Sequence, residues 1–370
     1  MNSINKIIFY KENMMKKIRL AIIGQGRSGR DIHGAFFKSE SNTLYDVVAV
    51  VEKDAARRDL ALVEYSGCKV YEDYTELFGK DDIDLVVNAS YSEMHYSVTK
   101  DLLVHGFNVL VEKPFGRNRY ECDDLMKTAK DKGVLLAVFQ QSFFAPYYIF
   151  AKELVDSGKL GKIEQIDIKY NNFVRRWDWQ TLQYKVAGSV YNTCPHPIGL
   201  ALGFLDFDEN AALVFSRLAV THTEGDAEDY SKLIITAPGK MLIDIETNCL
   251  DAYPQTLMKI CGSKGTFKCD LKNYEMKYMV DGENPDRPVI HESLKNAEGM
   301  PAYCSEKLEL HEESGEFAGT SFNAAVKSFY EMLYKSLVDG EDLVITPEMA
   351  ARVIGIIEKA HADNPLPVKY

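Results

Sequence analysis

The chain has 370 residues, of which 46% are hydrophobic and 26% are charged, and its formal net charge is −12. This length predicts two domains, each with enough apolar mass for a core, and the composition excludes a disordered or fibrous protein. The acidic balance leaves no basic face large enough for nucleic acid or an anionic membrane surface, so neither is an expected partner.

The seven cysteines are odd in number and contain no Cys-x-x-Cys pair, which argues against a disulfide framework and against a structural zinc site. We therefore expect a reduced, cytoplasmic protein without a metal. No apolar run approaches the roughly 18 residues that a membrane span requires. Residues 1–15 precede the first predicted strand and are interpreted as an N-terminal extension, either native or the product of an upstream start codon that the cell does not use.

The first part of the chain, from residue 18 to residue 140, alternates short apolar runs with longer amphipathic ones. This order is typical of the strands and helices of a parallel sheet. The runs are rich in Val, Ile and Leu with little polar alternation, so helices are expected on both faces of the sheet. We predict strands at 18–23, 47–51, 69–71, 85–89, 109–111 and 134–139. The prediction for residues 16–140 is a doubly wound α/β domain of the Rossmann type.

Residues 141–370 are predicted to form a second domain, because their strands alternate apolar and polar residues. This alternation is clear at 166–170 and again at 241–246, and it indicates one face that is wet or faces a partner. Pro238-Gly239 has the order of a type II turn, so an antiparallel hairpin is expected there. At the end of the chain, an apolar helical face runs over 322–337, and a second helix is predicted to begin at Thr346-Pro347-Glu348.

A Gly-x-Gly-x-x-Gly motif follows the first predicted strand directly. Its first glycine permits a tight turn, its second lets the backbone approach a pyrophosphate, and its third lets the next helix pack close to the strand. The start of that helix supplies amide donors and a positive dipole end. Because the motif opens the domain, we favour dinucleotide binding over a turn required only by sterics. The predicted cofactor residues here are Gly24, Gly26, Arg27, Ser28 and Gly29.

Glu52 stands at the end of the second predicted strand, 23 residues after Gly29. An acid at this place accepts hydrogen bonds from the ribose hydroxyls of an adenosine and repels a 2′-phosphate, which favours NAD over NADP. The alternatives are a solvated strand end and a phosphate held by the nearby Lys53, Arg57 and Arg58.

Glu112-Lys113-Pro114 lies at the carboxyl end of the strand predicted at 109–111. Ligands of open parallel sheets bind in the crevice outside these strand ends. A lysine ammonium at this position can hydrogen-bond a substrate oxygen and stabilise charge that develops there during hydride transfer. An ordinary solvated lysine is the alternative, which Pro114 weakens because it restricts the conformation of Lys113.

His196 stands between Pro195 and Pro197, ahead of an apolar, helix-like run over 198–205. Pro197 disfavours the helical region for His196 and favours helix initiation at the next residue, so the imidazole is expected beside a helix N-terminus. A positive dipole end keeps the ring neutral near pH 7, which is the state that a general base needs. The alternative is a capping or packed histidine.

Four motifs in this order resemble those of the Gfo/Idh/MocA family of NAD(P)-dependent oxidoreductases, and the resemblance covers residues 18 to 360. They are the glycine loop, Glu112-Lys113-Pro114, residues 154–163 and residues 260–266. The resemblance implies a Rossmann domain followed by a substrate-binding domain with a large open antiparallel sheet. It implies that the free face of this sheet builds a homodimer or homotetramer. It also implies hydride transfer between a secondary alcohol of a sugar, glycoside or polyol and the cofactor.

The resemblance assigns two catalytic residues. Lys113 would hold the substrate oxygen near the nicotinamide, and His196 would accept the proton. The second motif of the family usually reads Asp-x-Gly-x-His-x-x-Asp, but here Asn192, Cys194 and Gly199 replace the first acid, the glycine and the last acid. Asparagine cannot take a proton, so proton transfer falls on His196, and Asn192 is expected to orient the hydroxyl or the imidazole.

The remaining candidates border the cofactor or the substrate. Asn88 and His95, after the fourth strand, resemble a family segment on the nicotinamide side, and Glu112 is placed with them; a helix-start histidine without a role is the alternative for His95. Both tryptophans of the chain lie close to two arginines, an arrangement that suits a sugar ring, although an interface would use the same residue types. The predicted substrate-binding residues are Arg175, Arg176, Trp177, Asn192 and His196.

These observations predict a cytoplasmic NAD-dependent sugar or polyol dehydrogenase or reductase, with Lys113, His196 and Asn192 as its catalytic residues. Two rivals stay open because the acids are missing. The first is an enzyme that retains its NAD and oxidises a glycoside transiently, so that bond cleavage by elimination follows. The second is a regulator that binds a dinucleotide or a sugar and catalyses nothing.

Overall fold

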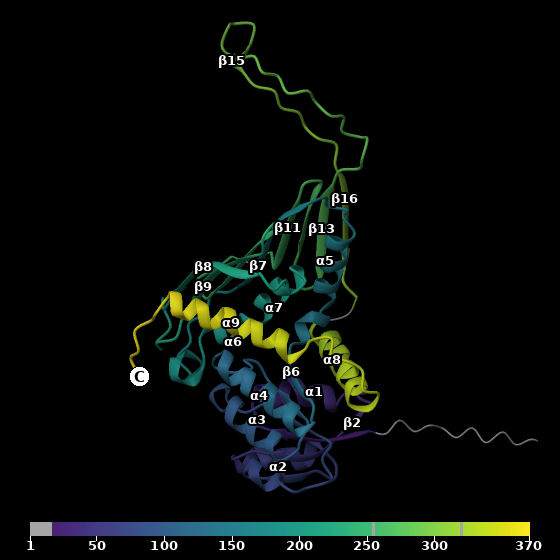
Figure 1. Ribbon diagram of the computed structural model, residues 1–370, viewed down its shortest axis with the longest axis vertical. Coiled ribbons are helices and arrows are strands. Elements are labelled where there is room, and N and C mark those ends of the chain that lie inside the picture. The colour runs from purple at the N-terminus through teal and green to yellow at the C-terminus, as the bar shows by residue number, and fades with distance from the viewer. Residues whose placement is uncertain (1–16, 254–255, 319–320) are drawn as a thin grey trace, which may run out of the picture.

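The computed structural model describes residues 17–253, 256–318 and 321–370. Residues 1–15, interpreted as an extension, lie outside the described residues. A parallel sheet with its helices forms one end of the molecule, a larger sheet forms the middle, and two C-terminal helices lie between them (Figure 1).

Six parallel strands build the first sheet in the order β3-β2-β1-β4-β5-β6, which confirms the doubly wound arrangement. The strands are β1 (Ile18–Ile23), β2 (Tyr45–Val51), β3 (Lys69–Tyr71), β4 (Leu85–Asn88), β5 (Val109–Val111) and β6 (Leu136–Val138). All residues of β4, β5 and β6 are buried, as expected for strands that are covered on both faces.

Helical segments connect these strands, and side-chain caps mark the starts of α2, η2 and α4. Asp54 accepts the backbone N–H of Arg57 at the start of α2, and Asn118 accepts that of Glu121 at the start of α4. The segments are η1 (Arg27–His33), α1 (Gly34–Phe37), α2 (Ala55–Glu64), η2 (Tyr74–Leu77), η3 (Ser92–Met94), α3 (His95–Val104) and α4 (Arg119–Lys132).

The larger sheet has the strand order β16-β13-β12-β11-β7-β10-β9-β8. Its strands are β7 (Ile163–Asn171), β8 (Ala212–Ala219), β9 (Tyr230–Thr236), β10 (Leu242–Asn248), β11 (Met258–Gly262), β12 (Gly265–Cys269), β13 (Asn273–Tyr278) and β16 (His311–Glu316). The hairpin of β9 and β10 turns at Pro238-Gly239, where Gly239 has φ +74°, so the predicted turn is confirmed.

The expectation of a wholly antiparallel sheet needs one correction, because β7 and β10 run parallel. The chain crosses over between them through helical segments and two further strands, and such a crossover is what parallel neighbours require. The helical segments of the crossover are η5 (Trp179–Thr181), η6 (Gln183–Lys185), α6 (Ser189–Asn192) and α7 (Pro195–Phe204). Two other helical segments, η4 (Gln141–Phe144) and α5 (Pro146–Asp156), precede β7.

The two C-terminal helices, α8 (Ser321–Val338) and α9 (Pro347–Asp363), confirm the helical prediction, and Thr346 caps α9 by accepting the N–H of Met349. Although helix α8 follows the second sheet in the chain, it packs against the first sheet. Phe329 and Tyr330 of α8 are fully buried in one core with Leu20 and Ile22 of β1. The C-terminal part of the chain therefore completes the core of the first domain. Within the described ranges, no helix offers the apolar length that a bilayer crossing demands.

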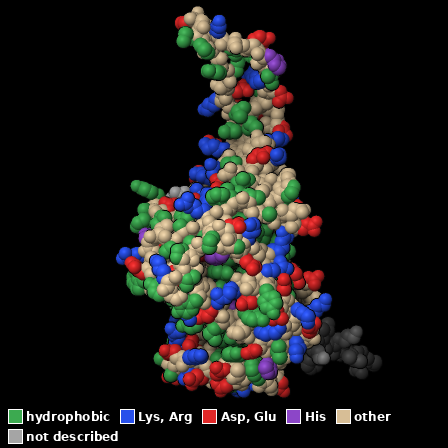
Figure 2. Space-filling model, turned by 60° about the vertical axis from the view of Figure 1, so that its left-hand side comes forward, with side chains coloured by type: hydrophobic (Ala, Val, Ile, Leu, Met, Phe, Trp, Pro, Cys, Tyr) green, Lys and Arg blue, Asp and Glu red, His purple; other side chains and the backbone are tan. Residues whose placement is uncertain are grey.

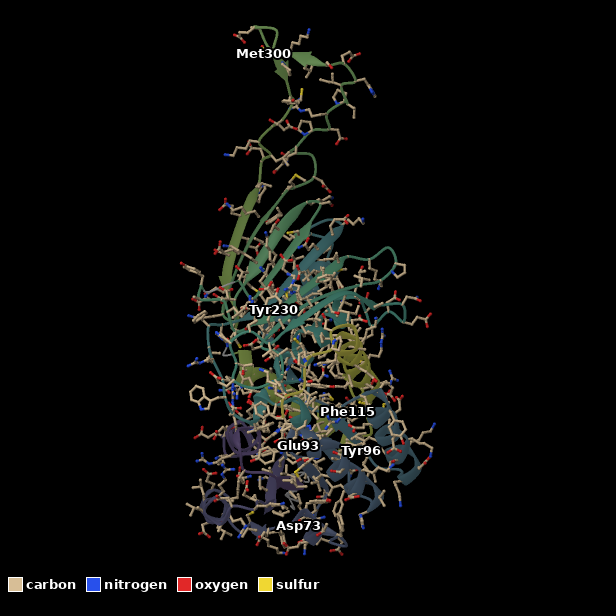
Figure 3. The ribbon with its side chains drawn as sticks, turned by 90° about the vertical axis from the view of Figure 1, so that its left-hand side faces the viewer. Asp73, Glu93, Tyr96, Phe115, Tyr230 and Met300 are labelled. Carbon is tan, nitrogen blue, oxygen red and sulfur yellow. The ribbon has the colours of Figure 1, made fainter. Side chains whose placement is uncertain are left out.

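A long arm leaves the edge of the larger sheet between β13 and β16. It contains the short strands β14 (Leu294–Lys295) and β15 (Pro301–Ala302), with Met300 at its tip (Figure 3). Hydrophobic, acidic and basic side chains are interspersed along the arm (Figure 2), and Tyr303 is 91% exposed. The sequence analysis did not predict this arm, since a segment without a buried face shows no apolar periodicity.

Candidate functional site

The glycine loop has the geometry that a pyrophosphate site needs. Gly24 has φ +93°, and its N–H donates to the Val51 carbonyl at the end of β2 (2.8 Å). A Cβ on Gly29 would lie 1.8 Å from the Gly24 carbonyl oxygen, so only glycine fits there. A Cβ on Gly26 would meet no atom within 4 Å, and this open space above the loop fits a dinucleotide. Arg27 and Ser28 begin η1 directly beside it.

Glu52 lies against this loop, as the sequence predicts. Its Oε2 accepts the N–H of Gln25 (2.8 Å), and its Oε1 accepts the N–H of Asp54 (3.0 Å). Arg58 donates to the backbone carbonyls of Glu52 and Lys53, so its guanidinium is already engaged. Arg57 lies 3.7 Å from the Glu52 carboxylate. The carboxylate is therefore held at the carboxyl end of β2, against the glycine loop.

Lys113 reaches from the Rossmann half of the chain to the second half. Its Nζ donates to the backbone carbonyl of Asn192, the last residue of α6, at 2.9 Å. Burial lowers the pKa of Lys113; the Glu112 carboxylate opposes this shift, and the guanidinium of Arg27 adds to it. The lysine that follows β5 therefore contacts α6 and lies within the electrostatic influence of Arg27.

His196 belongs to the same place. Its Nδ1 lies 3.3 Å from the Ser142 hydroxyl, and burial, followed by the positive charge of Lys113, lowers its pKa to about 3. The ring is therefore neutral over the physiological range. The expectation that the helix begins after His196 is wrong: α7 begins at Pro195, because prolines are tolerated in the first turn of a helix, and His196 itself is helical.

A cavity of about 680 Å³ opens beside α6. Its lining includes Tyr170, Arg176, Ser189, Asn192, Thr193 and Asn248. Of the five predicted substrate residues, Arg176 and Asn192 line this cavity, whereas Arg175, Trp177 and His196 do not, and Lys113 lies outside the lining as well. Trp177 is 75% exposed, and Arg175 pairs with Glu224 at the surface (3.5 Å), so the assignment of these two residues to the substrate site is corrected.

Comparison with known proteins identifies the family. Residues 18–140 match the "Oxidoreductase family, NAD-binding Rossmann fold", and residues 148–268 match the "GFO/IDH/MocA C-terminal domain". The chain belongs to the Gfo/Idh/MocA family of oxidoreductases. The arm between β13 and β16 lies beyond the part of the C-terminal domain that matches.

Three curated relatives of this Gfo/Idh/MocA protein illustrate the similarity. An uncharacterized oxidoreductase of Schizosaccharomyces pombe is 31% identical over 51% of this chain and 52% of its own, so the match spans about half of that relative. The 2,7-anhydro-N-acetylneuraminate hydratase of Mediterraneibacter gnavus is 24% identical over 75% of this chain and 74% of its own. The scyllo-inositol 2-dehydrogenase (NADP(+)) IolW of Bacillus subtilis is 23% identical over 93% and 92%.

A solved structure with the same fold is that of GenD2 from gentamicin A biosynthesis, in complex with NAD. It superposes with a TM-score of 0.74 at 18% identity, over 96% of this chain and 97% of that one. At this identity the likeness concerns the fold.

The structure shows what replaces the acids of the usual Gfo/Idh/MocA motif. A Cβ on Gly199 would lie 2.9 Å from Gln140 Oε1 and 3.1 Å from the Phe143 ring, so neighbouring side chains fill the space of the last acid. The thiol of Cys194 is buried against the hydroxyls of Ser231 and Thr247. Packed neutral side chains therefore occupy the space of the last acid, and a buried thiol stands in place of the glycine of the motif.

Asn192 keeps a place in the site although it lacks an acidic group. Its Nδ2 donates to the Gln180 carbonyl (3.2 Å), while its backbone carbonyl anchors Lys113. In this arrangement Asn192 positions the ammonium.

Three predicted cofactor residues lie behind the site. The Asn88 side chain is fully buried and bonds to His95, Thr99 and Ser90. His95 is 2% exposed, and its ring nitrogens face the carbonyls of Pro114 (2.8 Å) and Ser90 (3.2 Å). Glu112 is 2% exposed. Direct contact with a dinucleotide is therefore corrected to support of the loops that surround it, because these polar atoms are used inside the protein.

Gln140 and Ser142 were missed by the sequence analysis. Both are buried beside α7, just after β6. The signal was available, because they follow the carboxyl end of a parallel strand just as Lys113 does.

Proposed function

We propose that this protein is an NAD-dependent dehydrogenase or reductase that acts on a secondary alcohol of a sugar, glycoside or polyol. One observation carries the proposal: Lys113 bonds to the Asn192 carbonyl, beside a neutral His196, at the carboxyl edge of the Rossmann sheet. The cavity that Asn192 lines is of a size that suits a small polar molecule. The name of the inositol dehydrogenase relative agrees with a polyol substrate.

The residues of the glycine loop fit the cofactor. The amide groups of Gly26, Arg27 and Ser28 would hold the pyrophosphate, and Glu52 would accept hydrogen bonds from the adenosine ribose. When bound, NAD accepts or returns a hydride at the carbon of the nicotinamide ring.

In the proposed reaction, Lys113 stabilises the developing charge and His196 transfers the proton. The Lys113 ammonium donates a hydrogen bond to the reacting oxygen and stabilises negative charge as it develops. His196, neutral in the resting site, takes the hydroxyl proton during oxidation and returns it during reduction. Since the positive charge of Lys113 lowers the pKa of His196, the site tolerates one positive charge better than two.

A second candidate is transient oxidation with retained NAD, followed by elimination and no net redox change. The neutral replacements at Asn192 and Gly199 favour it, since they depart from the acids usual in the family. The name of the hydratase relative agrees with such chemistry on an anhydro sugar.

The experiment that tests both candidates is a panel of polyols, aldoses and glycosides, incubated with NAD or NADP. We expect reduced nicotinamide to absorb in the presence of at least one polyol or sugar, with NAD preferred because of Glu52. Product without accumulated NADH would select the elimination mechanism instead. Tight NAD binding with no turnover on the whole panel would contradict both and would leave a regulator.

We also propose that a second copy of the chain packs on the sheet face opposite α7. On that face Ile234 is half-buried, and Lys232 is neutralised by Asp244 (2.6 Å) and Glu246 (3.3 Å). Light scattering after gel filtration is expected to give the mass of a dimer or tetramer for the wild-type protein. The Ile234→Asp variant is expected to be monomeric, because the substitution places an unpaired charge in the interface. Val63→Asp, on the exposed side of α2, is the matched control. A monomeric wild-type protein would contradict this proposal.

A further inference from the structure

A buried chain of polar side chains runs from α8 to the peptide of Lys113, and the reaction proposed above does not use it. Tyr330 Oη lies 2.7 Å from His33 Nδ1, and His33 Nε2 lies 3.2 Å from Glu112 Oε1. Glu112 Oε2 accepts the backbone N–H of Lys113 at 3.0 Å. The side chains of Tyr330, His33 and Glu112 are at most 2% exposed, so they depend on one another for partners.

The direction of each hydrogen bond follows from the chemistry of the groups. Burial raises the pKa of Tyr330 well above its usual range, so its hydroxyl keeps its proton and donates to His33 Nδ1. A neutral imidazole that accepts at Nδ1 carries its hydrogen on Nε2. That N–H faces Glu112 Oε1. Glu112 Oε2 therefore accepts a regular hydrogen bond from the Lys113 N–H, whereas Oε1 and His33 Nε2 are in electrostatic contact at 3.2 Å without the geometry of a hydrogen bond.

This arrangement keeps the buried Glu112 carboxylate charged. Burial alone would raise the pKa of Glu112, but His33, Lys113 and His95 together lower it to about 2. Glu112 is consequently an anion beside Lys113. The charged groups that act on Lys113 are Glu112 from the end of β5 and Arg27 from η1, while Lys113 itself lowers the pKa of the titratable His196 from α7. Glu112 favours the protonated amine, whereas the cation of Arg27 disfavours it.

We propose that His33 and Tyr330 are positioning residues that hold Glu112 ionised beside Lys113 and thereby keep the Lys113 side chain in its ammonium form. Tyr330 comes from α8, which is 297 residues away from His33 along the chain, so the packing of the C-terminal helix contributes to the charge of the site. The proposal rests on the proposed function only for the use made of that ammonium.

The test measures the protonation of Lys113 directly, in the full-length protein without substrate. Competitive labelling with acetic anhydride across a pH series, read by peptide mass spectrometry against the exposed Lys259, gives the midpoint at which Lys113 becomes reactive. His33→Leu removes the polar ring nitrogen beside Glu112 and is expected to lower the midpoint by about one pH unit. Tyr330→Phe is expected to lower it less, and His33→Gln, which retains an N–H donor, is expected to restore most of it.

Tyr45→Phe is the matched control. The Tyr45 hydroxyl is equally buried and bonds to the same helix, at the Tyr330 carbonyl (2.7 Å), but it does not contact His33. This variant is expected to keep the wild-type midpoint. Should His33→Leu fail to fold, Tyr330→Phe carries the test, since it removes a single oxygen atom.

Two outcomes would overturn the proposal. In the first, Tyr330→Phe keeps the wild-type midpoint while Glu112→Gln lowers it, which would make His33 and Tyr330 mere packing. In the second, Tyr45→Phe shifts the midpoint as much as Tyr330→Phe, which would indicate general loosening around α8. Because labelling needs no substrate, a failed substrate panel leaves this result intact, and a failed labelling test leaves the panel intact.

Discussion

Replacement of Lys113 by methionine is expected to lower turnover by about 100-fold to 1,000-fold, the loss typical of a removed oxyanion donor, while the affinity for NAD changes little. Methionine keeps the length of the side chain but cannot donate to the substrate oxygen or to the Asn192 carbonyl, which now lies 2.9 Å from Nζ. Steady-state kinetics on the substrate found in the panel, with NAD binding by calorimetry, would measure both quantities.

The matched control for this prediction is Lys100→Met. Lys100 is a partly buried lysine of α3 that pairs with Asp124 (2.7 Å) away from the site, and its loss should leave turnover near that of the wild type. If Lys113→Met lost turnover and NAD binding together, the lysine would be holding the fold or the cofactor. If it lost neither, Lys113 would have no part in the reaction.

Replacement of His196 by alanine is expected to lower turnover by about 100-fold to 10,000-fold, the contribution typical of a general base. The sign of the pH dependence follows from the pKa of about 3, which burial and Lys113 impose. The imidazole gains its proton only below that value, so it remains available as a base throughout the neutral range. Wild-type kcat/KM should therefore hold steady from pH 7 down to pH 5, where an ordinary histidine would already be protonated.

At alkaline pH, the activity is expected to depend on the protonation of Lys113. Lys113 must keep its proton to act, and burial lowers its pKa, so wild-type activity should fall as the pH rises toward the lowered value. In His196→Ala, the activity that depends on the neutral ring disappears, while replacement of the exposed His105, at the C-terminal end of α3, by alanine serves as the control. An unchanged rate in His196→Ala would show that this residue takes no part in proton transfer. A loss of wild-type activity below about pH 6.5 would show that the pKa of His196 is not lowered.

Much of the fold could be predicted because its signals are local. The runs at 18–23, 69–71 and 109–111 are the observed strands. The first and third could be recognised from their apolar, mostly buried residues alone, whereas 69–71 is short and only half-buried and was recognised from its place in the alternation of strands and helices. The Gly24 turn, the cap at Thr346 and the hairpin at Gly239 each follow from the backbone preference of one or two residues. The boundary of α7 was wrong because tertiary packing overrode the usual effect of Pro197 on the preceding residue.

The candidate site was predictable only in part. Lys113 and Glu52 were found because both follow the carboxyl ends of parallel strands, where position alone indicates a ligand. Trp177 was misplaced because residue type carries no information about which side of a loop faces a cavity. Asn88 and Glu112 were misplaced because a polar residue at a strand end can face outward to a ligand or inward to a partner such as His33.

The sequence by itself determined the Rossmann domain, the glycine loop and the acid that faces it, since these depend on backbone preference and on spacing within about thirty residues. Only the tertiary structure decided that Lys113 meets the Asn192 carbonyl, that β10 lies parallel to β7, and that Tyr330 closes a chain to Glu112 through His33. Each of these depends on contacts between segments far apart along the chain. The protonation states of the site follow from burial, which arises only when those segments pack together.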